Sequence, residues 1–330
     1  MVLNLDELSK FSNEEMLAGP SRSYTLYKGV ILLKKLIVLL FIWILIIIIT
    51  PGILTMLFNL IDSETEIIVY DYQLQKKRKL NLEEYVQGVV AAEMPASFPI
   101  EALKAQAIAA RTYALKKKYE GQRLTTSSKF DQAWLSKEDL KDKWSANNFF
   151  SNWSKVSTAV EETEGLVLVY DNQLITAAYH STSGGQTAAA VEVWGGNVPY
   201  LKSVDSYCES ESPYYNQQQF FSWQQLSKKL NTSNYKQAQI ISRSNSGRVL
   251  KIKINKQIFS GRNIRQKLGL NSTKFRVVQS SQGIKFIVDG FGHGVGMSQY
   301  GAQGLAQRGC NFIEILNYYY PHAEISSGKK

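Results

Sequence analysis

One stretch of the sequence limits the possible folds more than any other. From Leu36 to Ile61 the chain has no charged residue, and this apolar run exceeds the roughly 20 residues that a helix needs to cross a bilayer. A cleaved signal peptide is the alternative, but the run is too long for the apolar core of a signal peptide, and no small-residue cleavage site follows it. The sequence therefore predicts one uncleaved transmembrane helix over residues 36–61.

Charged residues on either side of this run predict its orientation. The last charged residues before it are all basic, Arg22, Lys28, Lys34 and Lys35, and the first charged residues after it are all acidic, Asp62, Glu64 and Glu66. Because basic flanks stay on the cytoplasmic side, we expect residues 1–35 to be a cytoplasmic segment and residues 62–330 to be extracytoplasmic. Nucleotides are not freely available there, and the sequence predicts no cofactor.

The net charge indicates what the outer segment attracts. The formal charge is +10, of which residues 1–35 contribute +1. A basic protein attracts polyanions, and outside the membrane these are lipid headgroups, teichoic acids and the carboxylates of peptidoglycan. Nucleic acid is not predicted as a partner, because no basic run is interleaved with aromatic residues. A charge that serves solubility alone is the alternative.

Residues 81–119 have the pattern of two helices separated by one short break. Asn81 opens a capping-box pattern, and apolar residues follow it at helical spacing. Pro95 disfavours helical backbone at the residue before it, so the first helix should end near Glu93. Pro99 suits the start of a second, Ala-rich helix that continues to the end of the stretch.

Glu93 is the candidate general acid. At the C-terminal end of a helix the partial negative charge of the backbone disfavours a carboxylate, and Met94 and Phe98 add apolar surface. Both effects raise the pKa of a carboxyl group. A carboxylic acid that stays protonated near neutral pH can protonate a leaving oxygen. A solvated carboxylate at a helix end is the alternative interpretation.

A resemblance to a known family begins at this residue. The stretch around Glu93 reads EMPASFPIEALKAQAIAARTY, which resembles the signature of the stage II sporulation protein D family, and the resemblance covers most of the chain from about Tyr70 onward. It implies a membrane-anchored peptidoglycan lytic transglycosylase that acts on glycan strands during spore engulfment, beside a cell-wall amidase and other engulfment proteins. In that reaction Glu93 would serve as both acid and base. Relatives described as amidase enhancers share the signature, so a non-catalytic, wall-binding activator of an amidase is the second hypothesis.

Two further motifs share this resemblance. One is HSTSGG, which implies a glycan cleft lined by His180, Ser181 and Ser183. The other is GHGVGMSQYGA, which implies that His293, Gln299 and Tyr300 come near Glu93. The four glycines of the stretch 290–296 permit positive φ values, and we expect the backbone there to approach a ligand closely.

Other chemistries fit these residues less well. His180 and Ser183 lack both the G-x-S-x-G elbow and the orienting acid of a serine hydrolase. The glycine-rich stretch lacks the G-K-[ST] ending of a phosphate loop. A zinc amidase would need three protein ligands, and neither an H-E-x-x-H motif nor a Cys/His cluster is present, so the sequence predicts no metal.

Supporting roles are predicted for residues near these motifs. Lys104 and Arg111 share one face of the second predicted helix. There they could bind the muramic carboxylate, hold the loop of Glu93 or form structural ion pairs. Tyr179, Tyr200 and Tyr319 are candidates to stack on sugar rings or to orient hydroxyl groups, with core packing as the alternative.

The chain between the two halves of the signature changes character. Residues 206–288 contain strand patterns such as Val249–Ile254 and a helix pattern at Phe220–Leu230. We therefore expect an α+β fold in which the helix pair packs on strands and residues 206–288 form a smaller, β-rich inserted unit.

Cys208 and Cys310 are expected to be free thiols, because a chain this long does not need a disulfide. Local patterns elsewhere predict helices at Lys137–Lys143 and Lys155–Thr163 and strands at Leu166–Tyr170 and Gln173–His180.

Overall fold

The computed structural model describes residues 33–50, 65–233 and 236–327. The chain divides into two units, Met1–Glu64 and Thr65–Lys330, and each is described by itself. In the first unit, Leu33–Thr50 is an 18-residue helix whose length and composition would let it cross a membrane. The predicted span of 36–61 lies partly in this helix, and residues 51–61, like residues 1–32, lie outside the described residues.

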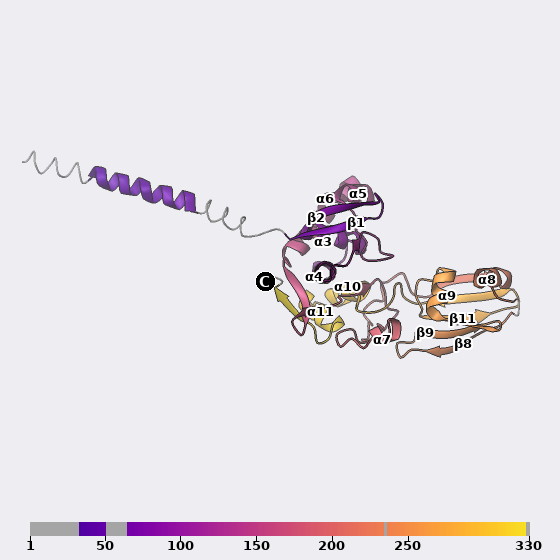
Figure 1. Ribbon diagram of the computed structural model, residues 1–330. Coiled ribbons are helices and arrows are strands. Elements are labelled where there is room, and N and C mark those ends of the chain that lie inside the picture. The colour runs from indigo at the N-terminus through magenta and orange to yellow at the C-terminus, as the bar shows by residue number, and fades with distance from the viewer. Residues whose placement is uncertain (1–32, 51–64, 234–235, 328–330) are drawn as a thin grey trace, which may run out of the picture. The chain divides into compact units, whose positions relative to one another are not determined.

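In the described part of the second unit, helices combine with five small sheets (Figure 1). The helices are α3 (Leu82–Glu93), α4 (Ile100–Tyr119), α5 (Lys137–Lys143), α6 (Ala146–Glu161), α7 (Ala190–Val193), α8 (Trp223–Leu230), α9 (Gly261–Leu268), α10 (Gln299–Gln307) and α11 (Phe312–Tyr319). The strands are β1 (Glu66–Asp71), β2 (Lys76–Asn81), β3 (Leu124–Thr125), β4 (Leu166–Tyr170), β5 (Gln173–Leu174), β6 (Tyr179–His180), β7 (Gln217–Ser222), β8 (Ala238–Arg243), β9 (Val249–Ile254), β10 (Gln257–Ser260), β11 (Phe275–Gln279), β12 (Gly283–Val288), β13 (Met297–Ser298) and β14 (Glu324–Ser327). This mixture confirms the predicted α+β class.

The predicted helix pair is present as α3 and α4. The side chain of Asn81 caps α3 by accepting hydrogen bonds from two amides of its first turn, at 2.7 and 3.2 Å. Met94 has extended backbone, with φ −115° and ψ 144°, and ends α3 directly before Pro95. Pro99 is the residue before the first turn of α4. The two prolines therefore fix the break between the helices.

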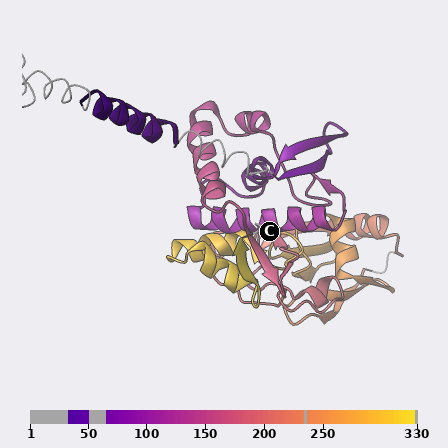
Figure 2. The ribbon, with the colours of Figure 1, turned by 60° about the vertical axis from the view of Figure 1, so that its left-hand side comes forward.

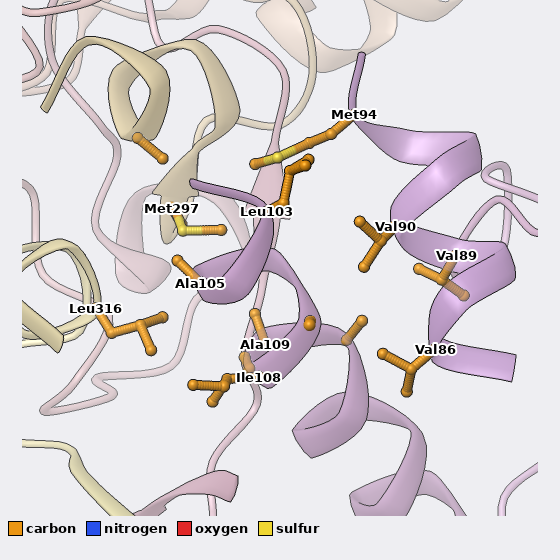
Figure 3. Packing of buried hydrophobic residues seen from close by; sticks show 14 of the residues in the cluster. Val86, Val89, Val90, Met94, Leu103, Ala105, Ile108, Ala109, Met297 and Leu316 are labelled. Carbon is orange, nitrogen blue, oxygen red and sulfur yellow. The ribbon is translucent and has the colours of Figure 1, made fainter. Parts of the chain in front are cut away.

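Helix α4 is the central element of the larger hydrophobic core. It contacts α3 and α6 as well as α10 and α11, and Figure 2 shows it running between these two groups. Many of its buried residues are alanines, and such small side chains let neighbouring helices approach closely. Figure 3 shows Val86 and Val90 of α3 on one side of α4 and Met297 and Leu316 on the other.

Small sheets join segments that are far apart in the sequence. β1 pairs antiparallel with β2 and parallel with β3, and β4 pairs antiparallel with both β5 and β14. β6 and β13 form a short parallel pair, in which Tyr179 lies beside Met297 and His180 beside Ser298. This last pair brings the HSTSGG motif to the start of α10.

A second hydrophobic core lies between Trp223 and Val288. It is built by the sheets β10-β9-β8 and β11-β12-β7 together with α8 and α9, which lie together at one end of the unit in Figure 1. These residues fall within the span 206–288 that the sequence marks as an inserted unit. β7 pairs with β12 along its full length, so the beginning and the end of this segment are held together.

Several local predictions agree with the structure. α5, β4 and β9 have the predicted bounds. Cys208 and Cys310 are free thiols.

Three local predictions were wrong in extent. The predicted helix Phe220–Leu230 begins as strand, because its first residues pair with β12 and the helix α8 starts only at Trp223. The predicted strand Gln173–His180 is divided into β5 and β6. The predicted helix Lys155–Thr163 is the second half of the longer α6. In the first case the partner strand β12 and in the second the partner strand β13 are distant in sequence, and local patterns do not contain that information.

Candidate active site

Glu93 lies at the meeting point of three segments. It is the last residue of α3 and is half-buried. Its Oε1 accepts the backbone amide of Ala133, in the loop before α5, at 2.6 Å. The side chain of Gln299, the first residue of α10, also hydrogen-bonds the carboxyl group. Both of these partners are neutral.

Burial raises the pKa of Glu93 above its ordinary value. The hydrogen bonds from Ala133 and Gln299 and the positive charge of Lys143 lower it, without cancelling the effect of burial. Lys143 ends α5, and its Nζ donates to two carbonyls in the last turn of α3 at 3.2 and 3.4 Å. It therefore offsets part of the negative potential at that helix end.

Neutral polar side chains surround the carboxyl group. The hydroxyl of Tyr85 donates to Gln132 at 3.1 Å, and Nε2 of Gln299 donates to Oε1 of Gln106 at 3.5 Å. Burial, and next the charge of Glu93, holds the pKa of Tyr179 well above its ordinary value. Gln132, Tyr85 and Gln106 were not predicted from the sequence. Tyr85 and Gln106 could have been found, because each carries a polar group on an otherwise apolar face of its helix.

The HSTSGG segment and the glycine-rich segment pack directly on each other. Gly292 and Gly296 both have positive φ. A Cβ atom on Gly296 would lie 1.9 Å from the carbonyl oxygen of Ala178, and one on Gly292 would lie 2.8 Å from Cβ of His180. The expectation was a close approach to a ligand, but the backbone here approaches the chain's own strand. Glycine is required because only it lets β13 lie this close to β6.

Three rings form a row that reaches the surface. The ring centroids of His180 and His293 are 5.7 Å apart, and those of His293 and Trp194 are 5.3 Å apart. Burial holds the pKa of His180 well below its ordinary value and lowers that of His293 to about 4. Both imidazoles are therefore neutral near pH 7, and the row ends at Trp194, which is 47% exposed. Within the described residues no group of three His, Cys, Asp or Glu side chains could hold a metal ion.

Glu209 holds the HSTSGG segment and the start of α10 together. It was not predicted from the sequence. It is 1% exposed and accepts hydrogen bonds from both the amide and the hydroxyl of Ser183, at 3.0 and 2.7 Å. It also accepts the amide of Gly185 at 2.6 Å and the hydroxyl of Ser298 at 2.5 Å. Because Ser298 caps α10, Glu209 helps to fix where Gln299 meets the carboxyl group of the site.

Lys104 and Arg111 form ion pairs away from the carboxyl group of Glu93. The guanidinium of Arg111 is 0% exposed and binds Glu83 through two nitrogens, at 2.7 and 2.5 Å. Nζ of Lys104 lies 2.8 Å from Glu101 and 2.6 Å from Glu162. Three roles were open for these residues: binding the muramic carboxylate, holding the loop of Glu93, or forming structural ion pairs. The contacts in the structure are those of structural ion pairs.

The remaining predicted residues divide between the site and the core. Tyr300 packs its ring on Phe98, in the loop after α3, with centroids 5.0 Å apart. Ser181 is half-buried beside the site. Tyr319 is buried and hydrogen-bonds Ser206 at 2.8 Å, and the hydroxyl of Tyr200 accepts the amide of Thr176 at 3.2 Å. The structure thus places Gln299 and Tyr179 near Glu93, Tyr300 against Phe98, and Tyr200 and Tyr319 in packing contacts.

Replacing Arg111 by methionine should lower the free energy of unfolding by about 3 kcal/mol, because it leaves Glu83 without its buried partner. Chemical denaturation of the full-length chain measures this. Lys104→Met on the same helix is the matched control, and its more solvated pairs should cost under about 1 kcal/mol. An Arg111→Met protein of unchanged stability would contradict the structural role of this ion pair.

The sequence of the chain is similar to those of known proteins. Residues 70–170 match the family model described as stage II sporulation protein, and residues 214–296 match a domain of unknown function. The chain is 38% identical over 274 residues to stage II sporulation protein D of Bacillus subtilis (strain 168) and 38% identical over 276 residues to that of Bacillus amyloliquefaciens, with 80% of each chain covered in both cases. It is also 30% identical over 301 residues to a Bacillus subtilis protein named amidase enhancer, which covers 73% of this chain and 40% of that protein. The chain therefore belongs to the stage II sporulation protein D family.

Proposed function

We propose that this chain is a membrane-anchored lytic transglycosylase. Its substrate would be peptide-stripped peptidoglycan, in which it cleaves the bond between N-acetylmuramic acid and N-acetylglucosamine to leave 1,6-anhydro-muramic ends. The observation that carries this proposal is the state of Glu93. The backbone amide of Ala133 holds its carboxyl group in place, and burial raises the pKa of that group, as a general acid near neutral pH requires.

The other carboxylates of this region support a scheme with one catalytic carboxyl group. Glu101 accepts hydrogen bonds from Lys104 at 2.8 Å and from an amide of α11 at 2.9 Å. Asp131 binds Tyr113 at 2.8 Å and Lys117 at 3.0 Å. Hydrolysing glycosidases use two carboxyl groups that flank the bond, and these candidates are occupied by structural contacts.

In the proposed reaction Glu93 acts twice. Its proton passes to the glycosidic oxygen, the bond from that oxygen to the anomeric carbon breaks, and an oxocarbenium-like state develops on the muramic sugar. The Glu93 carboxylate then takes the proton of that sugar's 6-hydroxyl, whose oxygen forms a bond to the anomeric carbon. No water is consumed, and Glu93 ends protonated again. The amides of Ala133 and Gln299 hold the carboxyl group in place between the two steps.

Mass analysis of the products tests this function. Full-length protein in detergent is incubated with peptide-free glycan strands, beside a Glu93→Gln variant. Anhydro-muramic ends formed by the wild type alone are expected. Reducing ends would show a hydrolase that uses a second carboxyl group.

An amidase activator is the second candidate, favoured by the similarity to the protein named amidase enhancer. In that case Glu93 would bind the wall without cutting it. Intact strands that sediment with the wild-type protein, together with faster peptide release by an added cell-wall amidase, would support this reading. Unchanged amidase rates would contradict it.

Location and process follow from the same proposal. The apolar helix Leu33–Thr50 would be a single-pass anchor in the cell membrane, with residues 1–35 in the cytoplasm and the unit that carries Glu93 outside. Membership of a sporulation family agrees with action on the septal wall during engulfment, beside an amidase that strips stem peptides. Protease treatment of intact cells, which should degrade the outer unit alone, tests the orientation.

The rate of cleavage should fall as pH rises through the pKa of Glu93, because the acid step needs the protonated form. Lys143 lowers that pKa through its positive charge, so Lys143→Gln should move the alkaline limb of the kcat/KM profile to higher pH. Lys155→Gln is the control, since Lys155 donates to a loop carbonyl at 3.5 Å and is not among the groups that shift Glu93. A limb that stays in place in Lys143→Gln would show that another group controls it.

A further inference from the structure

A pocket of about 260 Å³ opens beside α3. Its walls come from α3, from the loop before α5, from the start of α5 and from α6. The lining residues are Glu84, Gln87, Gly88, Trp134, Leu135, Lys137 and Trp153. The volume is slightly below the roughly 300 Å³ at which pockets for drug-sized ligands begin, so it suits one small ring.

This pocket lies away from the carboxyl group of Glu93. At 3.6 residues per turn, Glu84 and Glu93 are nine positions apart and project from opposite sides of α3. The loop before α5 borders both places, because Ala133 donates its amide to Glu93 and the next residue, Trp134, lines the pocket. The pocket is therefore a separate place on the same helix.

A buried donor without a partner borders the pocket. Trp134 is 7% exposed, and its indole N–H has no hydrogen-bond partner, although buried indole groups usually find one. The N–H edge lies against Gly88, where an added Cβ atom would come within 2.3 Å of Nε1. Gly88 therefore lets the indole edge pack directly against the backbone of α3, so Trp134 forms a buried wall of the pocket and its N–H is not open to a ligand.

The other walls have the chemistry that recognises a sugar. Trp153 is half-buried and supplies a ring, with Nζ of Lys137 4.9 Å from its centre. Gln87 and Glu84 add an amide and an exposed carboxylate at the rim. An aromatic wall with a few convergent polar groups is the usual composition of a small-ligand site, and here the polar groups match the hydroxyl and acetamido groups of an amino sugar.

We propose that this pocket binds one N-acetylated sugar residue of a glycan strand, as a second contact that holds the polymer while another part of it reaches Glu93. The identity of the polymer rests on the proposed function. The binding itself rests on the pocket and on the accessible side chains that line it, Trp153 and Gln87. A strand gripped at two places would dissociate more slowly than one held at the catalytic carboxyl group alone.

Equilibrium binding of peptide-free glycan strands tests this proposal. The parent protein is the full-length Glu93→Gln chain in detergent, in which cleavage does not change the ligand. Adding Trp153→Ala should weaken binding about three- to tenfold, the range expected for one aromatic contact of about 0.5–1.5 kcal/mol. Phe150→Ala is the matched control on α6, since Phe150 is 79% exposed and does not line the pocket, and it should bind as the parent does.

A second substitution keeps the test valid if Trp153→Ala fails to fold. Gln87→Leu removes an amide from the rim at a half-buried position and should also weaken binding. Unchanged affinity in both variants would overturn the proposal. Because the readout is binding by inactive protein, weaker binding in these variants would support the pocket even if the wild type formed no anhydro-muramic ends.

Discussion

Glu93→Gln should lower the rate of glycan-strand cleavage by about a thousandfold or more, because in the proposed mechanism one carboxyl group supplies both the acid and the base. Proton transfer by a positioned side chain typically contributes about 10²–10⁴ in rate, and glutamine can neither give nor take that proton. Its amide still fits between Ala133 and Gln299, so the thermal midpoint should change little. Rates come from the appearance of anhydro-muramic ends over time.

The matched control for this substitution is Glu161→Gln. Glu161 also ends a helix, α6, but it is exposed, so its loss should leave the rate unchanged. Substantial cleavage by a folded Glu93→Gln protein would contradict the assignment of Glu93 and direct attention to another carboxyl group.

Glu209→Ala should lower the free energy of unfolding by about 5 kcal/mol or more. Each buried donor left without its acceptor costs about 1–3 kcal/mol, and Ser183, Gly185, Tyr215 and Ser298 all donate to this carboxylate. Such a loss is comparable to the total stability of many domains, about 5–15 kcal/mol. Urea denaturation, or failure to obtain folded protein, measures it. Glu211→Ala is the control, because its exposed carboxylate receives only two side-chain amides, at 3.0 and 3.1 Å.

The same carboxylate should make stability depend on pH. Burial alone would raise the pKa of Glu209, but hydrogen bonds from Ser183, Ser298 and Gly185 outweigh it and hold the pKa below its ordinary value. Its contribution is therefore present above the pKa of the unfolded chain and is lost as pH falls through the folded one. Glu209→Gln should remove this part of the acid destabilisation. A Glu209→Gln protein with the wild-type slope of stability against pH below pH 4.5 would contradict this role.

The helix pair shows how far local patterns reach. Asn81, Pro95 and Pro99 act on their immediate neighbours, and the ends of α3 and α4 follow from them. The inserted unit shows the limit, because Phe220 has a helical pattern but pairs with β12. Strand pairing depends on a partner more than sixty residues away, and no periodicity within α8 records it.

Three features could be predicted from local sequence: an apolar helix before the folded unit, a carboxyl group at a helix end, and glycines beside two polar motifs. Which side chains are free to act depends on contacts that form only when the chain folds. Ala133 and Gln299 converge on Glu93, whereas Arg111 is bound by Glu83. These two kinds of feature differ in how far apart along the sequence the interacting residues lie. Helix starts and stops depend on a few neighbouring residues, whereas burial and strand pairing depend on segments that meet only after folding.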